Sequence, residues 1–184
     1  RRTNVVVRRN GSPLASGVYA YDAASRLQTV SAGGSSATYS YVANSPLVGQ
    51  IGFTHNGTGR MTTTKQHDFL NRLSALASGG TGSTPPLISF AYTYNAANQR
   101  TQATLGDLSY WGCEYDAPGQ VTSGRKYWSD GTPVAGQQFE YGFDDIGNRT
   151  QTKAGGDDSG AGLRPAAYTA NNLNQYTSRT VPGL

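Results

Sequence analysis

Carboxylate side chains are the first residues of this sequence whose type and spacing could do chemistry. Asp157 and Asp158 are adjacent in a glycine-rich segment, where two carboxylates could contact a Ca²⁺ ion. Calcium takes six or more oxygen ligands from several residues, and this pair supplies only part of such a set. The sequence therefore predicts no metal site, and leaves calcium contact open only at this acidic pair.

The remaining candidate ligands and nucleophiles are isolated in the sequence. His55 and His67 are twelve residues apart and lack the spacing of a known metal motif. Cys113 is the only cysteine, so neither an internal disulfide nor a cysteine zinc site can form. It lies in an aromatic-rich stretch, where a buried inert thiol is expected. No phosphate-binding or dinucleotide motif occurs, so we predict no cofactor and no enzymatic activity.

Two aromatic residues are the best candidates for ligand contact. Tyr127 and Trp128 run directly into Asp130 and Gly131, a pair typical of turns. A turn places side chains near solvent, and an aromatic face suits the apolar face of a sugar ring. We therefore keep Tyr127 and Trp128 as a possible glycan contact, with packing between strands as the alternative.

Most of the other acids recur at one position of a repeated pattern. Clear copies cover residues 19–27, 92–100, 114–121 and 141–149, and weaker ones cover 39–45, 67–73 and 168–176. The copies follow one another every 20 to 28 residues, and loops absorb the variation. Self-similarity of this kind indicates a repeat architecture, here with about seven units.

Each unit is predicted to be a strand, a tight turn and a second strand. Tyr-x-Tyr alternates with period two, so both rings lie on one face of a strand. Asp or Asn then ends the strand, because its side chain bonds backbone N–H groups further along. A Gly, Asn or Ser three residues later adopts a left-handed backbone at low cost. The motif residues are Tyr19, Tyr21, Asp22, Tyr41, Asp68, Tyr92, Tyr94, Asn95, Tyr115, Asp116, Tyr141, Phe143, Asp144, Gly147 and Arg149.

The predicted fold class is all-β, with tandem antiparallel hairpins forming one continuous curved or spiralling sheet. A lone hairpin is marginal in water, so neighbouring hairpins must bury a stripe of Tyr, Leu and Val between them. The Gly/Ser/Thr-rich stretches at 32–36, 78–86 and 155–162 are expected to be loops, since the repeat resumes after each. We expect one repeat domain over residues 1–184, a fragment of a longer protein.

The composition excludes several functional classes. Hydrophobic residues make up 36% and charged residues 14%, but 10% of the chain is aromatic, which argues against disorder. The net charge of +4 is spread along the chain apart from four arginines within the first nine residues, so no nucleic-acid partner is expected. No stretch approaches the roughly 18 apolar residues of a membrane helix, so we expect no membrane insertion.

The repeat units resemble the RHS/YD-repeat family, whose pattern is Tyr-x-Tyr-Asp-x-x-Gly-Arg-Leu. Residues 141–149 match with Phe143 in place of one Tyr, and residues 21–27 match with Ser25 in the Gly place. The resemblance implies a spiralling sheet that closes into a hollow shell. In bacterial RHS proteins and toxin complexes that shell holds a cytotoxic domain, and in teneurins a similar barrel serves adhesion. Those proteins carry self-cleaving aspartates after the repeats, and no residue here takes that role.

The expected function is a structural scaffold that encloses or presents a toxin or adhesion domain. It would be part of a secreted or cell-surface protein, which the family resemblance implies to be bacterial. Its expected partners are neighbouring repeats or other copies, and an enclosed toxin or a surface glycan in addition. One alternative is a carbohydrate-binding module that uses exposed aromatics. A second is a self-assembling fibre or tube, because an open sheet has edges that pair with other copies.

Overall fold

Strands are the only regular elements in the computed structural model, which describes residues 1–82 and 85–181. No helix in this described part could span a membrane. The fifteen strands are β1 (Asn4–Arg9), β2 (Ser12–Tyr21), β3 (Leu27–Ala32), β4 (Ser35–Tyr41), β5 (Val48–His55), β6 (Thr58–His67), β7 (Leu73–Gly80), β8 (Ile88–Tyr94), β9 (Arg100–Leu105), β10 (Tyr110–Tyr115), β11 (Val121–Tyr127), β12 (Pro133–Phe143), β13 (Arg149–Gly155), β14 (Leu163–Ala170) and β15 (Tyr176–Arg179).

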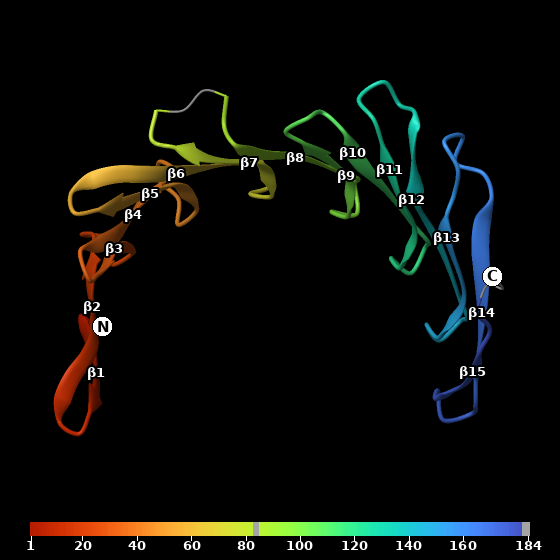
Figure 1. The fold of residues 1–184 in the computed structure, drawn as a ribbon, viewed down its shortest axis with the longest axis horizontal. Coiled ribbons are helices and arrows are strands. Elements are labelled where there is room, and N and C mark those ends of the chain that lie inside the picture. The colour runs from red at the N-terminus through yellow and green to blue at the C-terminus, as the bar shows by residue number, and fades with distance from the viewer. Residues whose placement is uncertain (83–84, 182–184) are drawn as a thin grey trace. The chain divides into compact units, whose positions relative to one another are not determined.

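The strands form one sheet whose order is the order of the chain, from β1 to β15. Each strand is hydrogen-bonded to its sequence neighbours, so every connection is a hairpin or a short loop (Figure 1). The prediction of an all-β fold made of tandem antiparallel hairpins is confirmed.

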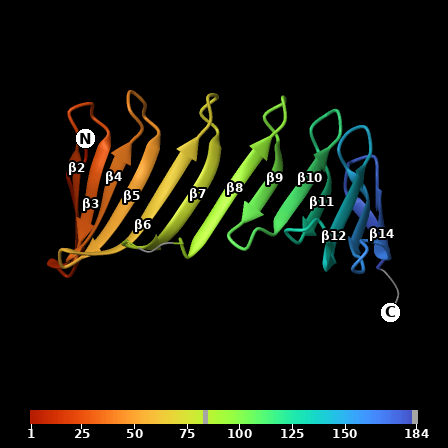
Figure 2. The same cartoon turned by 90° about the horizontal axis from the view of Figure 1, so that it is seen from above.

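Two compact units divide the chain, Arg1–Phe90 and Ala91–Leu184. The first holds β1 to β7 and the start of β8, and the second holds the end of β8 and β9 to β15. Within each unit the tight turns of the repeat lie at the same end of the strands (Figure 2). The single repeat domain expected over the whole chain stays a prediction.

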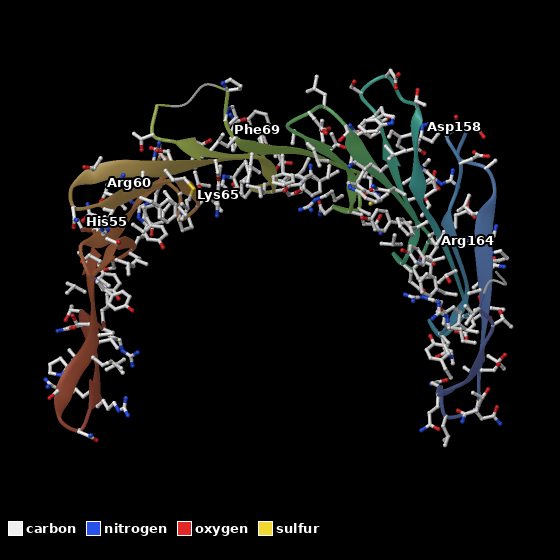
Figure 3. All side chains as sticks on the ribbon, in the orientation of Figure 1. His55, Arg60, Lys65, Phe69, Asp158 and Arg164 are labelled. Atoms are coloured by element: carbon white, nitrogen blue, oxygen red, sulfur yellow. The ribbon has the colours of Figure 1, made fainter. Side chains whose placement is uncertain are left out.

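The two faces of the sheet differ in chemistry because side chains alternate along each strand. Residues opposite one another in register share a face. One such row in the first unit joins Val30, Ala37, Phe53 and Met61, and its neighbour joins Tyr39 and Ile51. In the second unit an equivalent row joins Cys113, Gly124, Phe139 and Ala154. We call this side, which also carries the motif tyrosines, the aromatic face (Figure 3).

The opposite side, which we call the hydroxyl face in the first unit, is built from small polar residues. Thr29, Thr38, Gly52, Thr62 and Gly79 follow one another across five strands of that unit. Threonine is favoured on a pleated surface because its branched side chain packs against cross-strand neighbours.

Burial is far lower than expected for a stripe packed between hairpins. Val134 and Ala166 are the only buried apolar residues among those described, and the motif tyrosines are half-buried. The prediction of a buried Tyr, Leu and Val stripe was therefore wrong in degree. All fifteen strands of the described residues belong to this one sheet, and none of them forms a second layer over its face.

Candidate functional site

The Asp or Asn of each unit closes its turn with both backbone and side chain. Asp22 N donates to the Arg26 carbonyl (2.9 Å), and the Asp22 carbonyl accepts from Ser25 N (2.9 Å). Asp22 Oδ1 also accepts from Arg26 N (2.8 Å). The same three hydrogen bonds recur at Asp68, Asn95, Asp116, Asp144 and Asn171.

A left-handed residue stands three places after each of these anchors. The φ angles there lie between 59° and 96°, and the residues are Ser25, Asn71, Asn98, Gly119, Gly147 and Asn174. Glycine and asparagine tolerate this conformation best. Leu108 has φ 66° in the turn between β9 and β10, where its branched side chain is strained.

A β-bulge follows five of these six turns, and sequence reasoning did not predict it. Tyr21 pairs with Leu27 and Ala20 with Thr29, so Gln28 is the extra residue. Equivalent register shifts fall after the turns at Asp68, Asp116, Asp144 and Asn171. A bulge bends its strand and increases the local right-handed twist, so one extra twist is built into each of these units.

Arg26 ties its own turn to the next unit. Its Nε donates to Asp22 Oδ2 at 2.7 Å, and its Nη1 donates to the Ser45 carbonyl at 2.6 Å. The guanidinium also lies 4.2 Å from the centre of the Tyr41 ring. Only a planar, forked cation can make these three contacts together.

Tyrosine hydroxyls provide a second connection between units. Tyr41 Oη donates to the Leu27 carbonyl at 2.6 Å, and Tyr115 Oη donates to the Arg100 carbonyl at 2.7 Å. Both tyrosines directly precede a turn, and both acceptors lie five residues after the previous anchor. At the end of the chain Tyr176 Oη accepts from Arg149 N at 2.8 Å. The motif tyrosines therefore join one hairpin to the next.

Arginines also stack on the motif rings. Arg100 lies 4.0 Å from the centre of the Tyr92 ring. Arg149 lies 5.4 Å from Tyr141 in its own unit and 6.0 Å from Tyr168 in the next. Contacts of this kind contribute about 0.5–1 kcal/mol at exposed sites. The aromatic face is thus cationic as well as apolar.

Tyr127 and Trp128, the candidate residues for glycan contact, lie in two different environments. The Tyr127 ring stacks on Tyr110, with 5.1 Å between ring centres, on the face opposite the aromatic face. Trp128 is 50% exposed and closes the turn before β12, where its carbonyl accepts from Gly131 N at 3.0 Å. Trp128 is therefore the accessible member of the pair.

The structure places Asp157 in another turn of the repeat type. Asp157 Oδ1 accepts from the backbone N–H groups of Ser159 and Ala161, both at 2.9 Å. These bonds occupy Oδ1 of Asp157, one of the two carboxylates that were candidates for calcium contact. In the part of the chain that the structure describes, no three His, Cys, Asp or Glu side chains gather as metal ligands.

The histidines and the cysteine lie apart from one another. His55 and His67 end β5 and β6, at opposite ends of the β6 strand. His67 occupies the motif tyrosine position before Asp68, and its Nδ1 is buried without a hydrogen-bond partner among the described residues. Cys113 is half-buried on the aromatic face, and burial raises the pKa of its thiol. A protonated thiol is a poor nucleophile.

A charged network on the other face of the second unit was missed by sequence reasoning. Glu140 on β12 bonds Arg125 on β11 and Lys153 on β13, the latter at 3.0 Å. The Lys153 hydrogen bond is the largest cause of the lowered pKa of Glu140. Glu114 on β10 accepts from Ser123 Oγ at 3.0 Å. These pairs fix the register of four strands, and no signal in the sequence links residues so far apart.

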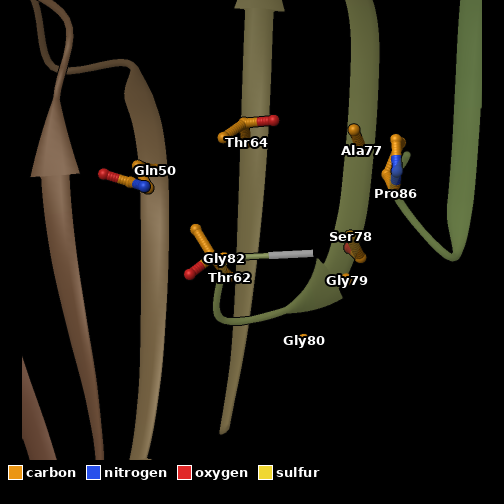
Figure 4. Close-up of a pocket in the computed structure, with 9 residues that line it drawn as sticks. All are labelled: Gln50, Thr62, Thr64, Ala77, Ser78, Gly79, Gly80, Gly82 and Pro86. Atoms are coloured by element: carbon orange, nitrogen blue, oxygen red, sulfur yellow. The ribbon is translucent and has the colours of Figure 1, made fainter. Parts of the chain in front are cut away.

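A hollow of about 380 Å³ opens on the hydroxyl face of the first unit (Figure 4). Hydroxyl and amide groups of Gln50, Thr62 and Thr64 line it, with Ala77 and glycines beside them. Such groups can donate and accept hydrogen bonds, and none of the described residues that line the hollow has a charged side chain.

Comparison with known proteins reveals a shared fold. No protein-family model matches the chain, and no curated protein sequence matches it. The TcdB2-TccC3-Cdc42 crystal structure aligns over 96% of this chain at 14% identity, with TM-score 0.56. The TcdB2-TccC3-TEV crystal structure aligns over 96% at 13% identity, with TM-score 0.54. Both agree with the RHS/YD-type fold expected from the repeat motif.

The alignment covers only a small part of those structures. This chain spans 13% of the length of each TcdB2-TccC3 chain. The Tc holotoxin pore of Photorhabdus luminescens aligns over 90% of this chain at 10% identity, with a TM-score of 0.26 that is too low to support an argument.

Proposed function

We propose that this chain is a segment of an RHS/YD-type wall, a structural scaffold within a longer extracellular bacterial protein. The wall encloses another domain of that protein, a toxin or an adhesion domain. The observation that carries the proposal is the series of connected hairpins, in which Arg26, Tyr41 and Tyr115 each bond the neighbouring unit. The residues of the motif serve this connection between units.

The exposed area of the chain supports an enclosing role. The chain exposes 12012 Å² at a mass of 19.4 kDa. A folded monomer of that mass exposes about 8,500 Å² by the usual scaling of surface with size. The aromatic face contributes to this excess, because its rings are only half-buried. Further polypeptide of the same protein would cover that face and remove apolar area from water.

Hydroxyl-radical footprinting of the full-length gene product would test the enclosure. Tyr19 and Tyr141 lie on the aromatic face, and their oxidation should fall severalfold in the full-length protein relative to this chain alone. Tyr110 and Tyr127 lie on the opposite face and serve as matched controls with unchanged oxidation. Equal oxidation of Tyr19 and Tyr141 in both proteins would contradict the proposal.

Carbohydrate binding is a second candidate, favoured by the half-exposed Trp128 side chain. A glycan array probed with the wild-type chain and with Trp128→Ala separates the two functions. Specific binding that disappears in Trp128→Ala would support a binding module. Absence of binding, or binding that the substitution leaves intact, would remove this candidate.

A further inference from the structure

A second hollow, of about 420 Å³, opens on the aromatic face of the first unit. It lies where β3, β4, β5 and β6 run beside one another, close to the turn between β5 and β6. Figure 3 labels His55 and Arg60, which belong to its rim. Its volume falls within the range of small-ligand pockets, and its lining comes from one compact unit.

The hollow exists because small residues stand between large ones. Ala37 on β4 lies in register between Val30 on β3 and Phe53 on β5. In the next row on the same face, Ser35 lies between Ala32 and His55. The short side chains of β4 leave a depression, and Val30 and Phe53 form its apolar walls.

The rim of the hollow carries an exposed cation, Arg60. On the same rim the His55 ring lies between two polar side chains, with Nδ1 at 3.0 Å from Ser35 Oγ and Nε2 at 3.3 Å from Asn56 Nδ2. Arg60 is exposed and forms no ion pair with a carboxylate in the described ranges. The Arg60 guanidinium therefore supplies a positive charge at the rim.

We propose that this hollow binds an apolar group that carries a carboxylate, with an aryl carboxylate as the best fit. The ring would lie against Phe53 and Val30, because this contact removes apolar area of both partners from water. The carboxylate would accept hydrogen bonds from the Arg60 guanidinium, which matches it as a two-pronged donor. The same chemistry is present in a free aromatic acid and in a peptide that ends in phenylalanine.

The experiment is an amide chemical-shift titration of the ¹⁵N-labelled chain with phenylacetate. Phenylacetate should shift amides of residues 30–37 and 53–60, with a Kd on the order of 1 mM, as weak single-anchor binding implies. The neutral isostere phenylacetamide should bind at least about tenfold more weakly, because it cannot pair with Arg60. Equal affinity for the two compounds would overturn the proposal.

Two variants test the two halves of the site. Arg60→Gln should weaken phenylacetate binding about tenfold, because it removes one charge-assisted hydrogen-bonded pair. Arg9→Gln should leave the affinity unchanged. Ala37→Leu should fill the depression and abolish binding, with the remaining amide spectrum intact as evidence of folding. An unchanged Kd in Arg60→Gln would refute the role of the Arg60 charge even if Ala37→Leu failed to fold.

A third arm identifies the source of the ligand. A short N-acetylated peptide with a C-terminal phenylalanine and a free carboxylate is titrated beside phenylacetate. Tighter binding of the peptide would support a polypeptide terminus as the ligand. Binding of phenylacetate alone would support a free aromatic acid, and binding of neither would contradict the proposal.

Discussion

The Tyr41 hydroxyl donates a 2.6 Å hydrogen bond to the Leu27 carbonyl, although the two residues belong to successive repeat units. The Tyr115 hydroxyl makes the equivalent bond to the Arg100 carbonyl in the second compact unit. The recurrence shows that a tyrosine immediately before a turn has the same structural role in both compact units. It holds its hairpin to the preceding one, in addition to contributing a ring to the aromatic face.

Tyr41→Phe should destabilise the chain because it removes the hydroxyl and keeps the ring under Arg26. Loss of one hydrogen bond of this type costs about 0.5–1.5 kcal/mol in the free energy of unfolding. Urea denaturation followed by circular dichroism measures the change. Tyr39→Phe is the control, since the Tyr39 hydroxyl makes no hydrogen bond among the described residues. Equal effects of the two substitutions would contradict the assigned role of Tyr41.

Phe143→Tyr should stabilise the chain. Phe143 stands before the Asp144 turn as Tyr41 and Tyr115 stand before theirs, and the equivalent acceptor is the Val121 carbonyl, five residues after Asp116. The added hydroxyl should raise the free energy of unfolding by about 0.5–1 kcal/mol. Phe69→Tyr adds the same hydroxyl at a fully exposed ring, and should leave stability unchanged. A loss of stability in Phe143→Tyr would show that the position differs from its counterparts.

Leu108→Asn should also stabilise the chain, through the backbone. Leu108 has φ 66°, and its side chain is 63% exposed, so little packing is lost on substitution. Asparagine occupies the same left-handed position at Asn71, Asn98 and Asn174. Relief of the strain should add about 0.5–1 kcal/mol to the free energy of unfolding. Leu173→Asn, outside the left-handed region, should give no such gain in the same measurement.

Acid should destabilise the turns that contain aspartate. The Asn148 side chain, followed by backbone N–H groups, lowers the pKa of Asp144, and the Arg26 backbone N–H does so most strongly for Asp22. The unfolded chain therefore binds more protons than the folded one near pH 4. Stability is fully present above the ordinary Asp pKa of about 3.9, and is lost as the pH falls through the lower folded values.

Thermal denaturation at pH 7 and at pH 3 measures this loss of stability. In Asp144→Asn the amide oxygen still accepts from Asn148 N, as Asn95 and Asn171 do in their turns, so the fall in Tm between the two pH values should be smaller. Asp145→Asn is the matched control, because the Asp145 side chain forms no hydrogen bond within the described part of the chain. A pH effect of the wild-type size in Asp144→Asn would contradict the assignment.

The turns were predictable because their chemistry is local. Asp22 and Ser25 are three residues apart, and their types alone indicate a side-chain acceptor followed by a left-handed residue. The Asp157 turn shows the same chemistry, but Ser159 and Gly160 in a glycine-rich segment made it resemble an irregular loop. The alternation of Tyr19 and Tyr21 was sufficient to predict a strand with both rings on one face.

The contacts between units could not be predicted, since they depend on register. The extra residue Gln28 shifts the strand register, which sets the carbonyl that lies opposite each donor. The residue type of Gln28 does not predict a bulge. The Arg125–Glu140 pair joins residues of two strands that come together only after that register is set. Half-burial of the rings was also missed, because a period-two pattern does not state whether a second layer covers the face.

The strand order has a consequence for how the repeat can change. Because each strand pairs with its chain neighbours, contacts are local in sequence, and folding can start at any hairpin and spread from it. Loss or duplication of a whole hairpin would leave the other interfaces intact. A sheet of this kind can therefore lengthen or shorten by whole hairpins without a change in the pairing of the strands that remain.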